Sequence, residues 1–321
     1  MEEILNFIKE GLKIPSITSK TKEFEDYITN KFTELGYNVK NQDNIIILQS
    51  KTNPNKQCFC AHLDRIGLIK TNDHYEYSSL YLKKKLKKLD KKGKNYFNEI
   101  INWFKKGTYS FKDKIYKIID SKIDVIDQSI KFTIDSKHPF LTLNNTLKVK
   151  DNKIIGQLDN IISIAVLYDI CNKENFQGTI LLSNNEEIGE SYKNIERIVK
   201  KLNLPKKELI VLDTSTEISD KEFEKGYIMI NSKELGYDNN QELYKKITQI
   251  AKENMIPFKS NIDNSFSELY QIIIHTKLNG ISVRIPRKKF HTSNETTSLK
   301  CLKNYSKLIV MINNLIKTNS T

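Results

Sequence analysis

The side chains best suited to chemistry stand at the ends of predicted strands. Apolar runs such as "CFCA" and "LIVL" are typical of buried strands, and acidic or imidazole residues follow them directly. In open α/β sheets, ligands bind at the edge formed by the carboxyl ends of parallel strands. The candidates at this edge, or just before an apolar helix, are His62, Asp64, Asp159, Glu186, Glu187, Asp213 and His291. We expect these side chains to converge.

Each candidate also has an ordinary structural explanation when it is taken alone. A histidine after a strand is often a hydrogen-bonded structural residue, and Asp159 before its apolar helix could be a simple N-cap. The combination is harder to explain in this way, because two histidines and several carboxylates meet at one edge in a chain with five histidines. Nitrogen and oxygen ligands without thiolates suit Zn²⁺, Co²⁺ or Mn²⁺. The pattern therefore predicts a metal site.

Predicted strands and helices alternate around the candidates. Apolar periodicity and turn residues predict helices at 4–12, 19–36, 158–171, 192–202, 240–256 and 294–317. Short apolar runs predict strands at 44–50, 58–62, 178–183, 208–213, 226–231, 269–274 and 279–286. Such alternation indicates a three-layer, mostly parallel α/β sheet, because parallel strands need helical crossovers.

Residues 70–150 depart from this alternation and predict an inserted α+β subdomain. A lysine-rich run, residues 83–95, holds eight Lys and is followed by aromatic and alternating β-like stretches. The lysines either form an RNA- or membrane-facing patch or cover the solvated face of a helix. The second interpretation is favoured, because the run contains no arginine. We therefore predict a catalytic domain, 1–69 and 151–321, interrupted by the insert.

The net charge of +13 first suggests a nucleic-acid partner, but the kind of basic residue argues against one. Of the 52 basic residues only four are arginine, Arg65, Arg197, Arg284 and Arg287. Nucleic-acid binders usually cluster arginine for bidentate phosphate contacts. The abundance of Lys, Asn and Ile fits an AT-biased genome at least as well, so we disfavour a nucleic-acid partner.

The sequence also bears on the compartment. No apolar run approaches the roughly 18–20 residues of a membrane span, so we expect no membrane partner. The segment "MEEILNFIKE" lacks the basic and long apolar regions of a secretion signal. The four cysteines predict reduced thiols, with Cys58 and Cys60 on one face of a strand. We therefore expect a cytoplasmic protein.

Five motifs occur in an order that resembles a known family: "AHLDRIG", "QLDN", "NNEEIG", "VLDTS" and "IPRKKFHTSNE". They are similar to the motif set of the glutamyl/TET-type aminopeptidases, which are cocatalytic dinuclear metallo-exopeptidases. The resemblance covers residues 1–70 and 150–316 and skips the insert, which is a separate subdomain in that family too. It implies an aminopeptidase that acts on short peptides and uses two divalent metal ions, of which Zn²⁺ and Co²⁺ are the favoured candidates. It also leaves room for a homo-oligomer, since the family's subdomain often builds large assemblies.

The resemblance also implies a role for each candidate. Asp159 would bridge the two ions, and the remaining ligand pairs would be His62 with Asp213 and Glu187 with His291. Glu186 would be the general base. Asp64 would orient the imidazole of His62 from outside the ligand set. In the wider clan the peptide bond after the bridging aspartate is often cis, so we predict a cis bond at Asp159–Asn160.

The match to the family is incomplete away from these residues. The arginine that usually follows the bridging pair is absent, and "SFSELY" stands where the family has a Gly-Thr-Asp stretch. Ser267 and Glu268 in that stretch could bind a substrate amine, but a structural role is favoured. Arg284, Lys288 and Lys289 precede the last motif's histidine. They either recognise a carboxylate or oxyanion near the metals or form a basic surface cluster.

Two other functions stay open at this point. One is a metal-dependent N-acyl or amide deacylase of the same clan, which a comparison of peptides with N-acyl amino acids would separate from a peptidase. The other is a non-catalytic protein that uses the basic insert to bind a partner. The intact set of Asp159, Glu186, Glu187 and His291 argues against the second, because pseudoenzymes commonly lose at least one ligand.

Overall fold

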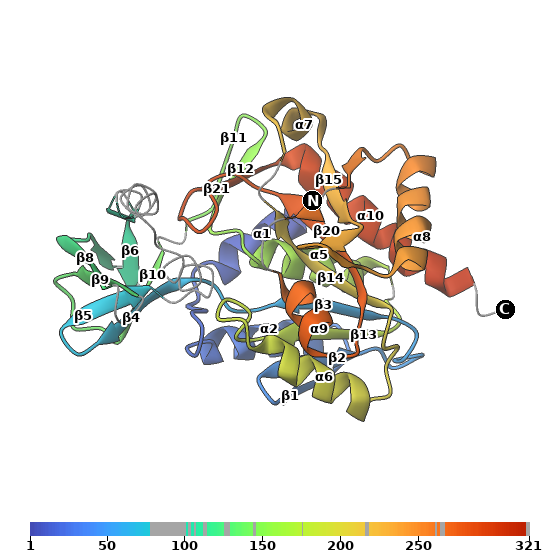
Figure 1. Cartoon of the computed structure of the whole chain (residues 1–321), viewed down its shortest axis with the longest axis horizontal. Helices are drawn as coiled ribbons and strands as arrows, with labels where there is room; N and C mark the ends of the chain where they lie inside the picture. Colours follow the sequence, from blue (N-terminus) through green and yellow to red (C-terminus); the bar gives the residue numbers. More distant parts are fainter. Residues whose placement is uncertain are drawn as a thin grey trace.

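The computed structural model describes most of the chain (Figure 1). The described residues are 1–77, 101, 104–105, 107–111, 114–124, 129–143, 146–174, 176–215, 218–260, 262–263 and 267–318. The lysine-rich run and its predicted helix lie outside this part of the chain. No helix within the described ranges is long and apolar enough to cross a membrane.

A central sheet of eight strands organises the larger part of the fold, in the order β1-β2-β13-β3-β14-β20-β15-β18. The four middle strands, β13, β3, β14 and β20, run parallel to one another. Their carboxyl ends therefore share one edge of the sheet, as predicted. The strands are β1 (Asn38–Gln42), β2 (Ile45–Gln49), β13 (Thr179–Ser183), β3 (Cys58–His62), β14 (Leu209–Ser215), β20 (Gly280–Pro286), β15 (Ile228–Asn231) and β18 (Phe258–Lys259).

Helices cover both faces of this sheet and give the predicted three layers. Strand β3 shows the division, because Phe59 and Ala61 face the larger apolar core while Cys58 and Cys60 face the smaller one. The larger core receives α1 (Glu2–Gly11), α2 (Lys22–Glu34), α5 (Ile161–Lys173), α7 (Asp220–Lys225), α8 (Gln241–Glu253) and α10 (Leu299–Thr318). The smaller core receives α6 (Ser191–Lys201) and α9 (Glu268–His275).

A second sheet of seven antiparallel strands lies beside the central one, at the left of Figure 1, and forms the inserted subdomain. It has its own apolar core around Tyr75, Phe104, Tyr109 and Phe132. Its order is β7 (Lys114–Tyr116), β6 (Tyr109–Phe111), β10 (Phe140–Leu143), β4 (Gly67–Thr71), β5 (His74–Tyr77), β9 (Ser129–Thr133) and β8 (Asp120–Asp124). The domain division stays a proposal, and this pairing favours an insert running from about 67 to 143.

A small sheet near the C-terminal helix corrects one prediction. The sequence predicts a helix from residue 294, but α10 begins at Leu299, and the preceding segment is strand β21 (Glu295–Ser298). This strand pairs with β12 (Lys153–Gly156), which in turn pairs with β11 (Lys148–Lys150). The β-branched Thr296 and Thr297 favour the strand, and the pairing partner lies too far away in sequence to be foreseen.

Segment 269–274 corrects a second prediction, because it is helical and not a strand. It belongs to α9, where the Ser267 hydroxyl caps the helix by accepting a hydrogen bond from the backbone N–H of Tyr270. Leu269 and Ile272 bury their side chains in the smaller core at helical spacing. A short apolar run does not distinguish the two structures, and here the cap residue decides. A further small sheet holds β17 (Tyr237–Asp238), β16 (Lys233–Glu234) and β19 (Ile262–Asp263).

Candidate dinuclear metal centre

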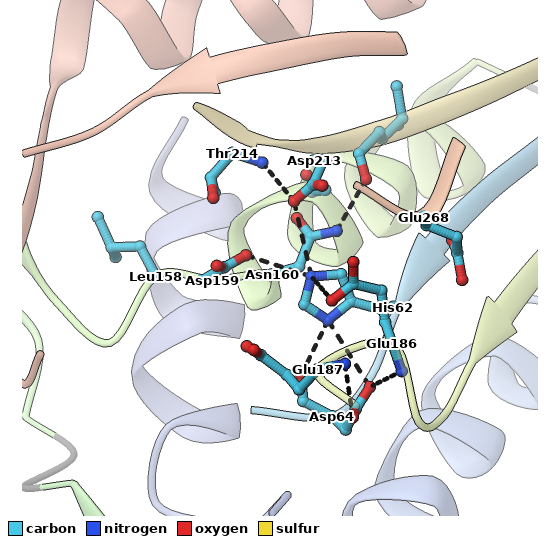
Figure 2. A network of polar contacts seen from close by, with 12 residues as sticks. His62, Asp64, Leu158, Asp159, Asn160, Glu186, Glu187, Asp213, Thr214 and Glu268 are labelled. Atoms are coloured by element: carbon cyan, nitrogen blue, oxygen red, sulfur yellow. Dashed lines mark hydrogen bonds and ion pairs between the residues drawn. The ribbon is translucent and has the colours of Figure 1, made fainter. Parts of the chain in front are cut away.

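The predicted residues converge at the carboxyl edge of the parallel strands. His62 ends β3, Asp213 lies near the end of β14, and Glu186 and Glu187 follow β13. Asp159 stands just before α5, where the Asn160 amide donates to the Leu212 carbonyl of β14 at 2.8 Å. The peptide bond between Asp159 and Asn160 is cis, which confirms that prediction. Figure 2 shows Asp159, Asp213, Glu186 and Glu187 gathered around the His62 ring.

The two carboxylate oxygens of Asp159 face different groups. Oδ1 lies 3.2 Å from Nε2 of His62, which is also 3.6 Å from Oδ1 of Asp213. Oδ2 lies 3.8 Å from Nε2 of His291, which is equally far from Oε2 of Glu187. Each of these two triads can bring one ligand atom per residue within 4.8 Å of the others. Two ions sharing Asp159 would therefore find three protein ligands each.

The donor set fits divalent metal ions. Oδ1 of Asp159 and Oε1 of Glu187 are buried and accept no hydrogen bond from the described part of the chain. Buried carboxylate oxygens normally have such partners, so these two atoms lack what a cation would supply. Imidazole nitrogen and carboxylate oxygen suit Zn²⁺, Co²⁺ and Mn²⁺. The residues present therefore fit the cofactor that the sequence predicts.

The electrostatics of the centre reflect crowded negative charge. Burial, reinforced by neighbouring carboxylates, raises the pKa of Glu187 well above its usual value. Burial opposes protonation of His62, but the carboxylates of Glu186, Asp159 and Asp213 raise its pKa well above the usual value. These pKa directions mean that protons would occupy the centre in place of cations, so that metal binding would release them.

Asp64 holds the loop that carries the two glutamates. Its buried carboxylate accepts hydrogen bonds from the backbone N–H groups of Glu186 at 3.2 Å and Glu187 at 3.3 Å, and from the Thr18 hydroxyl at 2.7 Å. The Nδ1 atom of His62 lies 2.9 Å from the backbone carbonyl of Asp64 but 3.8 Å from its carboxylate. The carboxylate thus accepts hydrogen bonds from the glutamate loop and from Thr18, while the His62 ring is within hydrogen-bond distance of the Asp64 backbone carbonyl.

Arg287 and Glu295 also lie at the candidate centre, although neither was predicted from the sequence. The Arg287 guanidinium donates to Asp159 Oδ2 at 2.5 Å and lies 2.9 Å from Glu295 Oε1. Glu295 accepts hydrogen bonds from the backbone N–H groups of Leu158, Asp159 and His291. It therefore fixes the backbone beside two candidate ligands. The signal for Arg287 was its position four residues before a candidate ligand, His291, in a chain with few arginines.

Two of the other basic residues before His291 pair with carboxylates outside the candidate centre. Arg284 is fully buried and pairs with Glu234, to which the Ser267 hydroxyl also donates. Lys288 is partly exposed and pairs with Asp220. The carboxylate-recognition role is therefore not supported for Arg284 or Lys288, and Ser267 has a structural role.

Glu268 gives the metal-free protein a predictable pH response. Its buried carboxylate accepts a hydrogen bond from the Ser183 hydroxyl, and burial raises its pKa to about 7. The folded chain then holds this proton more tightly than the unfolded chain does. Stability from this group is therefore fully present below about pH 4.5 and is lost as the pH rises to 7, by roughly 3 kcal/mol.

The test compares metal-free wild type with Glu268→Gln in urea unfolding between pH 4.5 and 7. We expect the variant to gain stability relative to wild type as the pH rises. A constant difference across this range would contradict the raised pKa.

Comparisons with known proteins identify the family. The family model described as M42 glutamyl aminopeptidase matches residues 109–308. No curated protein matches the sequence. Solved structures that share the fold include a TET aminopeptidase from a marine sediment archaeon of the Thaumarchaeota (TM-score 0.74, 12% identity, 99% of this chain and 96% of that chain).

Two further structures are similar over nearly the whole chain. One is an aminopeptidase from the archaeon Desulfurococcus kamchatkensis (TM-score 0.71, 12% identity, 100% of this chain and 98% of that chain). The other is the TET1 peptidase of Pyrococcus horikoshii, which can assemble into a tetrahedron or a large octahedral shell (TM-score 0.69, 14% identity, 97% and 99%). The family match covers more than half of the sequence, so the chain belongs to the M42 glutamyl aminopeptidase family and is a metallo-aminopeptidase.

Proposed function

We propose that the chain removes N-terminal residues from short peptides with two divalent metal ions, Zn²⁺ or Co²⁺ first, and Glu186 as general base. The observation that carries the proposal is the pair of histidine–carboxylate triads that share Asp159. His62 and Asp213 would hold one ion, and Glu187 and His291 the other. Bound ions would supply Lewis-acid activation of a water molecule and of the scissile carbonyl.

Glu186 is placed to move the proton. Its Oε2 lies 4.0 Å from Nε2 of His62, and its side chain is 12% exposed against 4% for Glu187. Burial, with the charges of Asp213 and Asp64, raises the pKa of Glu186 well above its usual value. With ions bound, the ionised carboxylate of Glu186 would accept the proton of the attacking water and return it to the leaving amine nitrogen. Asp64 supports this step by holding the Glu186 backbone.

Assembly and compartment are further parts of the proposal. The TET1 peptidase of Pyrococcus horikoshii can assemble into a tetrahedron or a large octahedral shell, so we propose that this chain also forms a homo-oligomer. All four cysteines are free and buried, which supports a cytoplasmic location. The family match and the complete ligand set favour peptide substrates over a nucleic-acid partner.

Metal analysis combined with a substrate panel tests the proposal. We expect two ions per wild-type chain at saturating Zn²⁺ or Co²⁺, and hydrolysis of aminoacyl peptides but not of N-acyl amino acids. His62→Ala should lose at least one ion and the activity, because it removes a ligand from the first triad.

His275→Ala is the matched control, since this histidine stacks on Tyr192 and belongs to neither triad. It should keep both ions. Fewer than two ions bound to wild type at saturating metal would contradict the proposal, and cleavage of N-acyl amino acids alone would indicate a deacylase instead.

A further inference from the structure

A tyrosine of the inserted subdomain contacts a histidine of the candidate metal centre. Tyr77 ends β5, and its hydroxyl oxygen lies 3.1 Å from Nδ1 of His291. The other ring nitrogen of His291, Nε2, faces Asp159 and Glu187 at 3.8 Å each. The imidazole therefore presents one nitrogen to the ligand triad and the other to the insert.

The direction of this hydrogen bond follows from the chemistry of a ligand histidine. A metal binds the deprotonated nitrogen of a neutral imidazole, so a ring that binds through Nε2 carries its proton on Nδ1. Nδ1 of His291 would then donate to the Tyr77 oxygen. Partners of this kind fix the tautomer and the ring orientation of a ligand histidine. For His62 the corresponding partner is the Asp64 carbonyl at 2.9 Å, within the catalytic sheet.

The Tyr77 hydroxyl is held in place by the core of the insert. The side chain is 5% exposed, and its ring packs edge-on against Phe104 with 4.5 Å between centroids. Phe104 in turn packs against Phe132 of β9, with 5.4 Å between the ring centroids. The backbone of Tyr77 pairs with that of Leu68 in β4. A shift of the tyrosine would therefore require the insert's core to repack.

His291 is fixed from its backbone as well. Its N–H donates to Oε1 of Glu295 at 2.6 Å, and its backbone lies in the left-handed region with φ +59°. These backbone contacts do not set the orientation of the ring, whose Nδ1 atom faces the Tyr77 hydroxyl. We propose that Tyr77 is a positioning residue through which the inserted sheet sets the orientation and tautomer of His291, and with them the affinity of the Asp159–Glu187–His291 site for its metal ion. This inference rests on the proposed two-metal function.

The test is a titration of the metal-free full chain with Co²⁺, followed by visible absorption and by competition with a chelator. Tyr77→Phe keeps the aromatic packing against Phe104 and removes only the hydroxyl. We expect the affinity of one of the two sites to fall by about 10- to 100-fold, as for other partners of ligand histidines, while the second site is unchanged.

Tyr75→Phe is the matched control. It removes a buried hydroxyl from the same face of the same strand, but that hydroxyl donates to the His138 and Ser136 carbonyls inside the insert. It should leave both affinities at the wild-type value. A second measurement needs no variant: histidine ¹⁵N NMR of the Zn²⁺-loaded chain should show His291 protonated at Nδ1.

The outcomes separate this inference from the proposed function. Wild type that binds fewer than two ions overturns both. If wild type binds two ions and Tyr77→Phe binds them with unchanged affinities, only the role of Tyr77 is overturned. The same holds if Tyr75→Phe loses as much metal affinity as Tyr77→Phe. A His291 ring that binds its ion through Nδ1 also overturns the role of Tyr77.

Discussion

Glu186→Gln should lower kcat for aminoacyl-peptide hydrolysis by about 10²- to 10⁴-fold and leave both metal ions bound. General acid–base groups typically contribute this factor, and an amide cannot accept the proton of the attacking water. The substitution keeps the size of the side chain and its backbone contacts with Asp64. KM should change little, because the lost interaction belongs to the transition state. Steady-state kinetics and metal analysis of the same preparation check the result.

The adjacent glutamate provides the control. Glu187→Gln should lower metal occupancy as well as activity, because Glu187 Oε2 faces His291 in the second triad. Glu186→Gln should therefore lose activity alone, whereas Glu187→Gln should lose a metal ion together with its activity. If Glu186→Gln kept more than a tenth of the wild-type kcat, another group would have to be the base. If it lost an ion, Glu186 would be a ligand.

The sequence predicted the candidate centre because its residues follow a general rule of parallel sheets. His62 and Asp213 come from strands that are neighbours in the sheet, so their position at strand ends already brings them together. The bridging role of Asp159 and the cis bond after it followed from the family resemblance. What the residues could not supply was the register of distant segments. Glu295 lies on β21, which pairs with a strand about 140 residues earlier.

The arginines carry information that the net charge obscures. Lysine makes up nearly all of the basic excess, and three of the four arginines, Arg65, Arg284 and Arg287, are buried. The fourth, Arg197, is exposed and pairs with Asp43. In a chain that uses lysine on its surface, arginine remains where a planar, always charged fork is needed in the interior. Rarity of arginine was therefore the available signal for Arg287, and only the fold shows which carboxylates it contacts.

Arg287→Met should lower the unfolding free energy of the metal-free chain by about 3–5 kcal/mol. Breaking a buried ion pair leaves its partners uncompensated, and here Asp159 and Glu295 would both lose their contact with the guanidinium. Burial disfavours the charged form of Asp159, but Arg287 and His62 hold the pKa of its carboxyl well below the usual value. Urea unfolding in the presence of a chelator measures the loss.

Saturating Zn²⁺ should restore part of the stability that Arg287→Met loses, but none of the stability that Arg284→Met loses. Arg287 donates to the same Asp159 oxygen that faces the second triad, so its removal should tighten metal binding there. Arg284→Met is the control, because Arg284 pairs with Glu234 instead. Its loss should be the same with and without metal.

Thermodynamic linkage relates the metal affinity of the Arg287→Met variant to the stability that it recovers with Zn²⁺. Each tenfold gain in metal affinity of the variant must equal about 1.4 kcal/mol of recovered stability, because both quantities are sides of one thermodynamic cycle. If the Arg287→Met variant is equally destabilised with and without Zn²⁺, Arg287 stabilises the chain through its contact with Glu295 alone. Recovery would instead show that Arg287 and the second ion compete for Asp159, so that the charge which stabilises the empty centre also weakens its metal site.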